Sequence, residues 1–111
     1  MSDLSTEALD TSQANAKKLL SEQIDSLLAQ LPDWVVKQVD SVERLEKVYS
    51  FKDFSAALAF TNQVGALAEQ EDHHPALLTE WGQVTVTWWS HGLGGVHRND
   101  LIMAARTDQL S

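Results

Sequence analysis

The sequence predicts an α+β fold, in which a four-stranded antiparallel sheet has three helices packed on one face. Apolar patterns follow one another in the order helix, strand, strand, helix, short strand, long strand and helix. The strands fall into two pairs with short connections, which is typical of antiparallel hairpins rather than of parallel βαβ units. A length of 111 residues is enough for one domain.

The chain is expected to begin with a tail and a helix. Residues 1–14 are polar and lack periodicity, which predicts a flexible N-terminal tail and a domain over 15–111. The helix should end before Pro32, because proline lacks an N–H and disfavours helical geometry in the residue before it. Its apolar positions have helical spacing and are Leu20, Ile24, Leu27, Leu28 and Leu31.

A β-hairpin is predicted next. Residues 34–39 are rich in β-branched side chains, and Asp40 and Ser41 supply a turn. The second strand alternates in the manner of a pleated strand, with one side made up of Leu45, Lys47, Tyr49 and Phe51. The short connection favours an antiparallel pair.

The long helix that follows has two apolar stripes. Asp53 is suited to cap it, and the helix should run to about Gln70. One stripe contains Phe54, Ala57, Leu58, Thr61 and Ala68, and the other contains Ala56, Phe60, Val64 and Leu67. Because a surface helix of a monomer buries one face, two stripes indicate either a wide, alanine-rich core face or a face that contacts another subunit.

The last hairpin and helix complete the predicted fold. A short apolar segment at 76–78 precedes an alternating strand at 81–90, and a glycine-rich connection at 92–95 follows. Asn99 or Asp100 is expected to open the final helix. The sheet face without helices needs polar side chains, and the candidates are Gln83, Thr85, Thr87 and Lys47.

Composition and charge exclude several classes of protein. Sixteen acidic and eight basic residues give a net charge of −8 at pH 7, which argues against binding to nucleic acid or to anionic membranes. No apolar run approaches the roughly 20 residues of a membrane span, and the N-terminus does not resemble a secretory signal, so a cytoplasmic location is expected. Without cysteine, any chemistry must use imidazole, carboxylate or hydroxyl groups.

Three histidines lie where predicted elements end. His73 and His74 follow the second helix, and His91 closes the long strand. Functional groups concentrate at such ends, and imidazole suits proton transfer near neutral pH. Ordinary loop histidines are the simplest alternative.

Other kinds of site fit the sequence less well. A metal centre would combine the three histidines with Asp72 or Asp100, but no two histidines have the i, i+4 spacing of a helical zinc motif. Ser90 is not part of a GxSxG nucleophile turn. The glycine-rich segment at 92–95 lacks the Lys-Ser/Thr of a phosphate-binding loop.

The histidines belong to a longer pattern of fixed spacing, made up of Glu69, His73-His74-Pro75, Trp81, His91 and Asp100. This pattern resembles that of the pterin-4a-carbinolamine dehydratase family, and the resemblance spans roughly residues 28–105. Three positions depart from the family pattern. Trp81 stands where tyrosine is commoner, Trp88 replaces a smaller aliphatic residue, and His97 replaces a threonine or serine.

The resemblance implies a lyase that removes water from 4a-hydroxytetrahydropterin to give quinonoid dihydropterin in tetrahydrobiopterin recycling. No metal or other cofactor is expected. The three histidines would surround the pterin, with His73 and His91 transferring protons and His74 positioning the substrate.

Three further residues would bind or support the substrate by the same resemblance. Glu69 would bind the pterin or orient a histidine. Trp81 would either stack on the pterin ring or lie in the core. Asp100 would either cap the last helix or orient His91.

The strongest alternative function is a protein-interaction module. Some members of this family serve as a dimerisation cofactor of a transcription factor, and an aromatic amino acid hydroxylase is another possible partner. The two apolar stripes of the long helix favour a homodimer or homotetramer. No direct nucleic-acid or membrane partner is expected.

Overall fold

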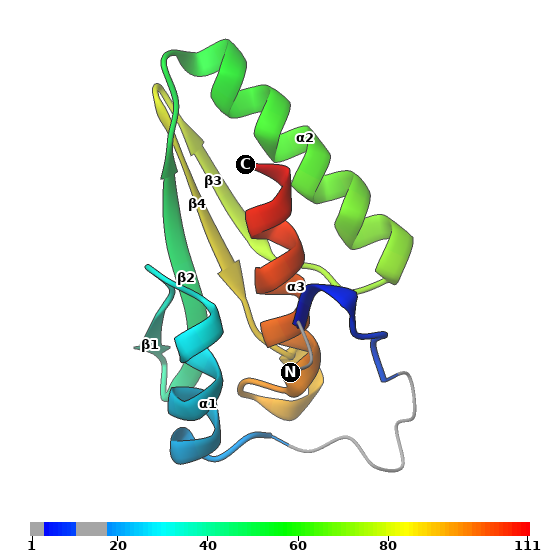
Figure 1. Cartoon of the computed structure of the whole chain (residues 1–111). Coiled ribbons are helices and arrows are strands. Elements are labelled where there is room, and N and C mark those ends of the chain that lie inside the picture. Colours follow the sequence, from blue (N-terminus) through cyan, green and yellow to red (C-terminus); the bar gives the residue numbers. More distant parts are fainter. Residues whose placement is uncertain (1–3, 11–17) are drawn as a thin grey trace.

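The computed structural model describes residues 4–10 and 18–111 and confirms the α+β fold (Figure 1). Three helices lie on one face of a four-stranded antiparallel sheet, as predicted. No helix in these described ranges is both long and apolar enough to cross a membrane. The elements are α1 (Ser21–Leu27), β1 (Val35–Val39), β2 (Val42–Ser50), α2 (Phe54–Glu71), β3 (Ala76–Glu80), β4 (Gln83–Trp88) and α3 (Arg98–Leu110), with 3₁₀ helices at Leu4–Thr6, Leu28–Gln30 and His91–Leu93.

The sheet has the strand order β1-β2-β4-β3, and all its neighbouring strands are antiparallel. Asp40 and Ser41 form the predicted first turn with φ of 53° and 66°, a geometry whose twist matches that of the flanking strands. Trp81 and Gly82 form the second turn. The sequence alternation predicted a strand that begins at Trp81. Strand β4 begins two residues later, at Gln83.

Helix α2 buries one face that draws on both predicted stripes. Asp53 caps the helix as predicted, since its carboxylate accepts a hydrogen bond from the N–H of Ala56 at 2.8 Å. Phe54 and Leu58 each remain 44% exposed. The core face is made up of Ala57, Phe60, Val64 and Ala68. The two predicted stripes thus do not form separate faces. Residues from both stripes form the core face, and Phe54 and Leu58 form a small exposed apolar patch.

Two helix ends differ from the prediction. Helix α1 ends at Leu27, and Leu31 is a buried loop residue that follows a 3₁₀ turn. Helix α3 is capped by His97 and not by Asn99 or Asp100, because Nδ1 of His97 accepts the N–H of Asn99 at 3.0 Å. The imidazole nitrogen supplies the acceptor that a serine or threonine hydroxyl usually provides at a helix N-cap.

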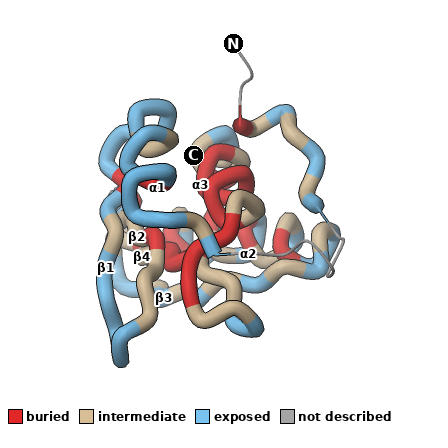
Figure 2. Tube along the Cα trace, turned by 90° about the horizontal axis from the view of Figure 1, so that it is seen from below, coloured by how far each residue is buried: buried red, intermediate tan, exposed pale blue. Residues whose placement is uncertain are grey.

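The core lies between the helices and the covered face of the sheet. Figure 2 shows α3 and β4 mostly buried, whereas the trace of β1 is mostly exposed. The uncovered face has polar side chains but also exposes Val48 and Leu78 by 50% and 57%. Lys47 was predicted on this uncovered face, and that prediction is wrong. It lies on the covered side, with its Nζ 2.9 Å from Asp108 of α3.

Asp108 joins the end of α3 to the first hairpin. One of its carboxylate oxygens accepts hydrogen bonds from Lys47 at 2.9 Å and from the indole of Trp34 at 3.1 Å. The Tyr49 hydroxyl donates to the same oxygen. Burial, this hydrogen bond and the charge of Asp108 raise the pKa of Tyr49 above its usual value.

An N-terminal arm, residues 4–10, packs along α3, so the prediction of a free tail is wrong for this part of the chain. Leu4 is only 1% exposed. The Glu7 carboxylate accepts two hydrogen bonds from Arg98, at 2.7 and 2.8 Å, and the Glu7 carbonyl accepts one from Arg106 at 2.7 Å. The predicted boundary between residues 14 and 15 lies outside the described residues.

Acid is expected to release the N-terminal arm. Hydrogen bonds from Arg98, with its positive charge, lower the pKa of Glu7 below its usual value despite partial burial. A carboxyl with a lowered pKa stabilises the folded state above its unfolded pKa, and this stability is lost as the pH falls through the folded value. Amide protection factors of residues 4–10 should therefore fall between about pH 5 and pH 3. In Glu7→Gln the protection factors of these residues should be low across the whole pH interval. Wild-type protection factors that stay constant across this interval would contradict the prediction.

Candidate functional site

The turn after α2 positions two adjacent histidines. Asp72 ends the helix with a left-handed φ of 50°, a common geometry at helix C-termini. The N–H of His73 then donates to the carbonyl of Ala68 at 3.1 Å. Pro75 follows before β3 begins. The imidazole rings of His73 and His74 have different partners.

Asp100 is the buried centre of the site. Its side chain has no exposed surface and lies in the first turn of α3. Oδ2 accepts hydrogen bonds from the Ser90 hydroxyl and the His97 N–H, both at 2.8 Å, and Oδ1 lies 2.6 Å from Nε2 of His73. Because an ionised carboxylate can only accept, Nε2 of His73 donates and Nδ1 is left for other contacts.

A stacked indole also holds the His73 ring. The ring centroids of His73 and Trp88 are 5.7 Å apart, and the two planes differ by 1°. Trp88 is fully buried, and its Nε1 donates to the Thr107 hydroxyl at 3.1 Å. A ring bonded at its edge and packed on its face has little rotational freedom, so His73 is oriented before any ligand binds.

His74 and Glu69 form a second pair of imidazole and carboxylate. Nε2 of His74 lies 2.5 Å from Oε2 of Glu69, and the two side chains are 51% and 77% exposed. An ion pair in contact with water is worth at most about 1 kcal/mol, so this pair is far less constrained than the buried one. The contact fits one of the two roles expected of Glu69, that of orienting a histidine.

His91 has a different environment. It begins the 3₁₀ helix after Ser90, and its ring centroid lies 4.3 Å from that of Trp89. Asp100 completes the cap of α3, because its carboxylate accepts the N–H of the N-cap residue His97, and the imidazole that it contacts is that of His73. Across residues 4–10 and 18–111, no three His, Cys, Asp or Glu side chains are grouped so that they could hold a metal ion.

Trp81 lies at the far end of the β3–β4 hairpin. It is 74% exposed in the turn, whereas His73 precedes the opposite end, where Ala76 pairs with Thr87. Strand β3 separates the two ends by about 13 Å at the usual rise per residue. Trp81 is therefore not a core residue, and the fold of one chain does not bring it to His73.

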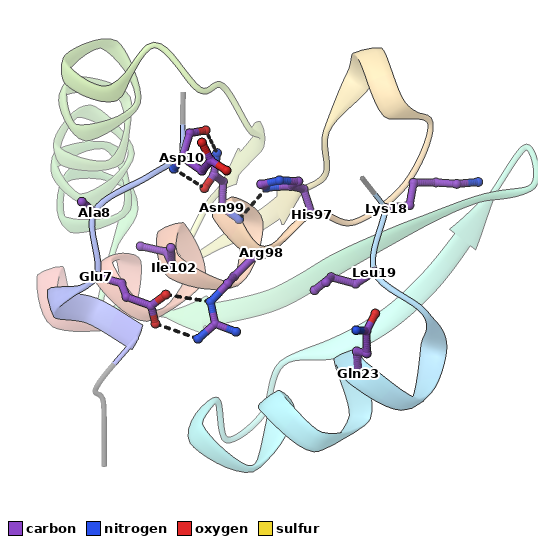
Figure 3. A pocket seen from close by; sticks show the side chains of 10 residues that line it. All are labelled: Glu7, Ala8, Asp10, Lys18, Leu19, Gln23, His97, Arg98, Asn99 and Ile102. Atoms are coloured by element: carbon purple, nitrogen blue, oxygen red, sulfur yellow. Dashed lines mark hydrogen bonds and ion pairs between the residues drawn. The ribbon is translucent and has the colours of Figure 1, made fainter. Parts of the chain in front are cut away.

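A pocket of about 370 Å³ lies apart from these residues, at the N-terminal end of α3 (Figure 3). The N-terminal arm, residues 18–23 and residues 97–102 contribute to its wall, and none of the six expected site residues lines it. Glu7 and Arg98 bond to each other across the wall, and the Asn99 amide bonds to the main chain of Asp10. Glu7 and Arg98, two of the charged groups in its wall, thus bond to each other.

Comparison with known proteins identifies the family. A family model described as pterin 4 alpha carbinolamine dehydratase matches residues 17–110. The chain belongs to this family. The crystal structure of a transcriptional coactivator/pterin dehydratase from Brucella melitensis is 32% identical, with a TM-score of 0.75, and the match covers 85% of this chain and 98% of that chain. A pterin dehydratase-like protein identified as a RuBisCO assembly factor in the alpha-carboxysome is 25% identical, with a TM-score of 0.58 and coverage of 70% and 88%.

Two residues that contact Asp100 and His73 in this member of the pterin carbinolamine dehydratase family were not among the expected site residues. Ser90 donates to Asp100, and Trp88 stacks on His73. The alternation of the last strand already placed Trp88 on the same side as Val84, but a local pattern does not show which side chain packs against it. Ser90 had a signal only in its position next to His91.

Proposed function

We propose that this chain removes water from 4a-hydroxytetrahydropterin and releases quinonoid dihydropterin. The observation that carries the proposal is the pair of His73 and Asp100, in which a carboxylate without exposed surface lies 2.6 Å from the imidazole. Such a carboxylate fixes the ring tautomer and balances the charge acquired when the other ring nitrogen takes up a proton. Membership of the pterin carbinolamine dehydratase family supports the choice of substrate.

The reaction needs two proton transfers and no change of oxidation state. One group protonates the 4a-hydroxyl, which leaves as water with the electron pair of the C–O bond. Another group accepts the N5 proton, and the electrons of nitrogen form the C4a=N5 double bond. We assign these transfers to His73 and His91, and we assign substrate positioning to His74 with Glu69. Since no electrons are exchanged with a second compound, no redox cofactor is needed.

A dehydration assay tests the proposed function directly. The wild-type chain should accelerate loss of water from a freshly generated carbinolamine, and His73→Ala or His91→Ala should each slow it by about 10²- to 10⁴-fold. His74→Ala should raise KM more than it lowers kcat. If all three variants fold and keep wild-type turnover, the assigned site is wrong. If the wild-type chain gives no acceleration, the function is wrong.

The exposed patch on α2 favours a second role in protein association. Phe54 and Leu58 are one helical turn apart, and each is 44% exposed. We propose that copies of the chain form a homodimer or homotetramer through this patch. We place this assembly in the cytoplasm, where an aromatic amino acid hydroxylase would supply the substrate. A transcription factor is the alternative occupant of the patch. Sedimentation of the full chain at micromolar concentration should show an oligomer, and a monomer would contradict the pairing of copies.

A further inference from the structure

The uncovered face of the sheet carries Arg44. Its Nε is buried and has no hydrogen-bond partner among residues 4–10 and 18–111. Within the part of the chain that the structure describes, Arg98 and Arg106 each form an ion pair with a glutamate, and no such pair involves Arg44. A buried N–H without an acceptor is costly and rare in folded proteins, so this donor indicates an acceptor that the described residues do not supply.

The neighbouring carboxylates are engaged elsewhere. Strand pairing places Lys37, a second cation, opposite Arg44. Glu46, the next acidic residue on the same face of β2, lies 3.0 Å from Nζ of Lys37. Glu43 alternates to the other side of the strand, where it accepts a hydrogen bond from Ser21 at 3.4 Å. Neither carboxylate therefore balances the charge of Arg44.

Trp89 connects Arg44 to His91. The guanidinium carbon of Arg44 lies 4.1 Å from the centroid of the Trp89 ring, and the ring of His91 lies 4.3 Å from the same side chain, centroid to centroid. Stacking on an indole suits a planar guanidinium and limits its motion. A fixed cation, a flat apolar surface and an imidazole thus lie together at one end of the sheet.

We propose that Arg44 and Trp89, next to His91, form an anion-recognition subsite that takes a negatively charged substituent of the substrate. The inference rests on the proposed function, because it assigns this substituent to a pterin whose ring reacts at His73 and His91. Ser90 directly precedes His91 and donates to the carboxylate that holds His73, so Ser90 connects the subsite to the reacting centre. The planar fork of a guanidinium matches the oxygens of a carboxylate or a phosphate group. The substrate class is therefore a tetrahydropterin carbinolamine with an anionic side chain.

Equilibrium binding of matched pterins to the full chain tests the subsite without using the reaction. 6-Carboxypterin and unsubstituted pterin differ by a carboxylate, and the phosphate ester of 6-hydroxymethylpterin differs from its parent alcohol by a phosphate. The wild-type chain should bind the anionic member of at least one pair about 10- to 100-fold more tightly. The pair with the larger ratio identifies the anion.

Variants then assign this preference to one side chain. Arg44→Gln should remove the difference between the paired ligands. Lys52→Gln makes a similar change of charge beyond the other end of β2 and should leave it intact. Arg44→Lys keeps the charge but loses the fork, so it should retain only part of the preference. If Arg44→Gln does not fold, Arg44→Lys tests whether the preference for the anionic ligand depends on this side chain.

The outcomes separate the subsite from the proposed function. Equal binding of both members in each pair, or an undiminished preference in folded Arg44→Gln, would overturn the subsite. A chain that dehydrates an uncharged carbinolamine and shows no preference for anions keeps the proposed function and loses the subsite. A chain that prefers the anionic ligand through Arg44 but accelerates no dehydration keeps the anion site and loses the function.

Discussion

Replacing Asp100 with asparagine should lower kcat for carbinolamine dehydration by about 10²- to 10⁴-fold, with little change in KM. The amide of asparagine keeps one oxygen, which still accepts from Ser90 or from the N–H of His97, so the start of α3 should persist. Toward His73 the amide offers no negative charge. The imidazole then loses both its fixed tautomer and the charge that balances uptake of a proton.

Asp72→Asn is the matched control for this experiment. It makes the same chemical change at an exposed residue directly before His73, where the left-handed φ of 50° suits asparagine as well as aspartate. Its kinetics should equal those of the wild-type chain. Thermal unfolding of both variants distinguishes a folding defect from a chemical one. If folded Asp100→Asn turned over as fast as the wild-type chain, His73 would not depend on its carboxylate and the proposed role of the pair would fail.

The order of elements was predictable because it depends on local patterns. The turn at Asp40 and Ser41 and the cap at Asp53 each follow from side-chain preferences that act within a few residues. The side of the sheet on which Lys47 lies could not be predicted from such local preferences. Its alternation with apolar neighbours indicated the covered side, whereas its charge indicated solvent. The carboxylate of Asp108, which is 61 residues further along the chain, decides for the covered side.

The candidate site was predictable in its composition but not in its contacts. Motif spacing selected His73, His91 and Asp100, and Asp100 was expected either to cap the last helix or to orient His91. The packing of α3 against the turn after α2 instead pairs Asp100 with His73 across 27 residues. The position of Trp81 also depends on such pairing, because the register of the β3–β4 hairpin places it in the turn and not in the core.

Replacing Asp108 with alanine should lower the free energy of unfolding by about 3 kcal/mol. The change leaves the ammonium of Lys47, the indole of Trp34 and the hydroxyl of Tyr49 without their shared acceptor. Each buried donor without a partner costs about 1–3 kcal/mol, but the costs are not simply additive here. The side chains of Lys47 and Asp108 are 16% and 25% exposed, so water can solvate part of what the carboxylate leaves.

Urea unfolding of three variants tests whether Asp108 acts through the whole network. Tyr49→Phe removes one donor and leaves Asp108 the other two, so it should cost only about 1 kcal/mol. Asp25→Ala removes an exposed carboxylate from α1 and should change stability by no more than about 0.5 kcal/mol. The expected order of losses is Asp108→Ala, then Tyr49→Phe, then Asp25→Ala. If Asp108→Ala cost no more than Tyr49→Phe, the hydrogen bonds from Lys47 and Trp34 would add nothing to the stability of the fold.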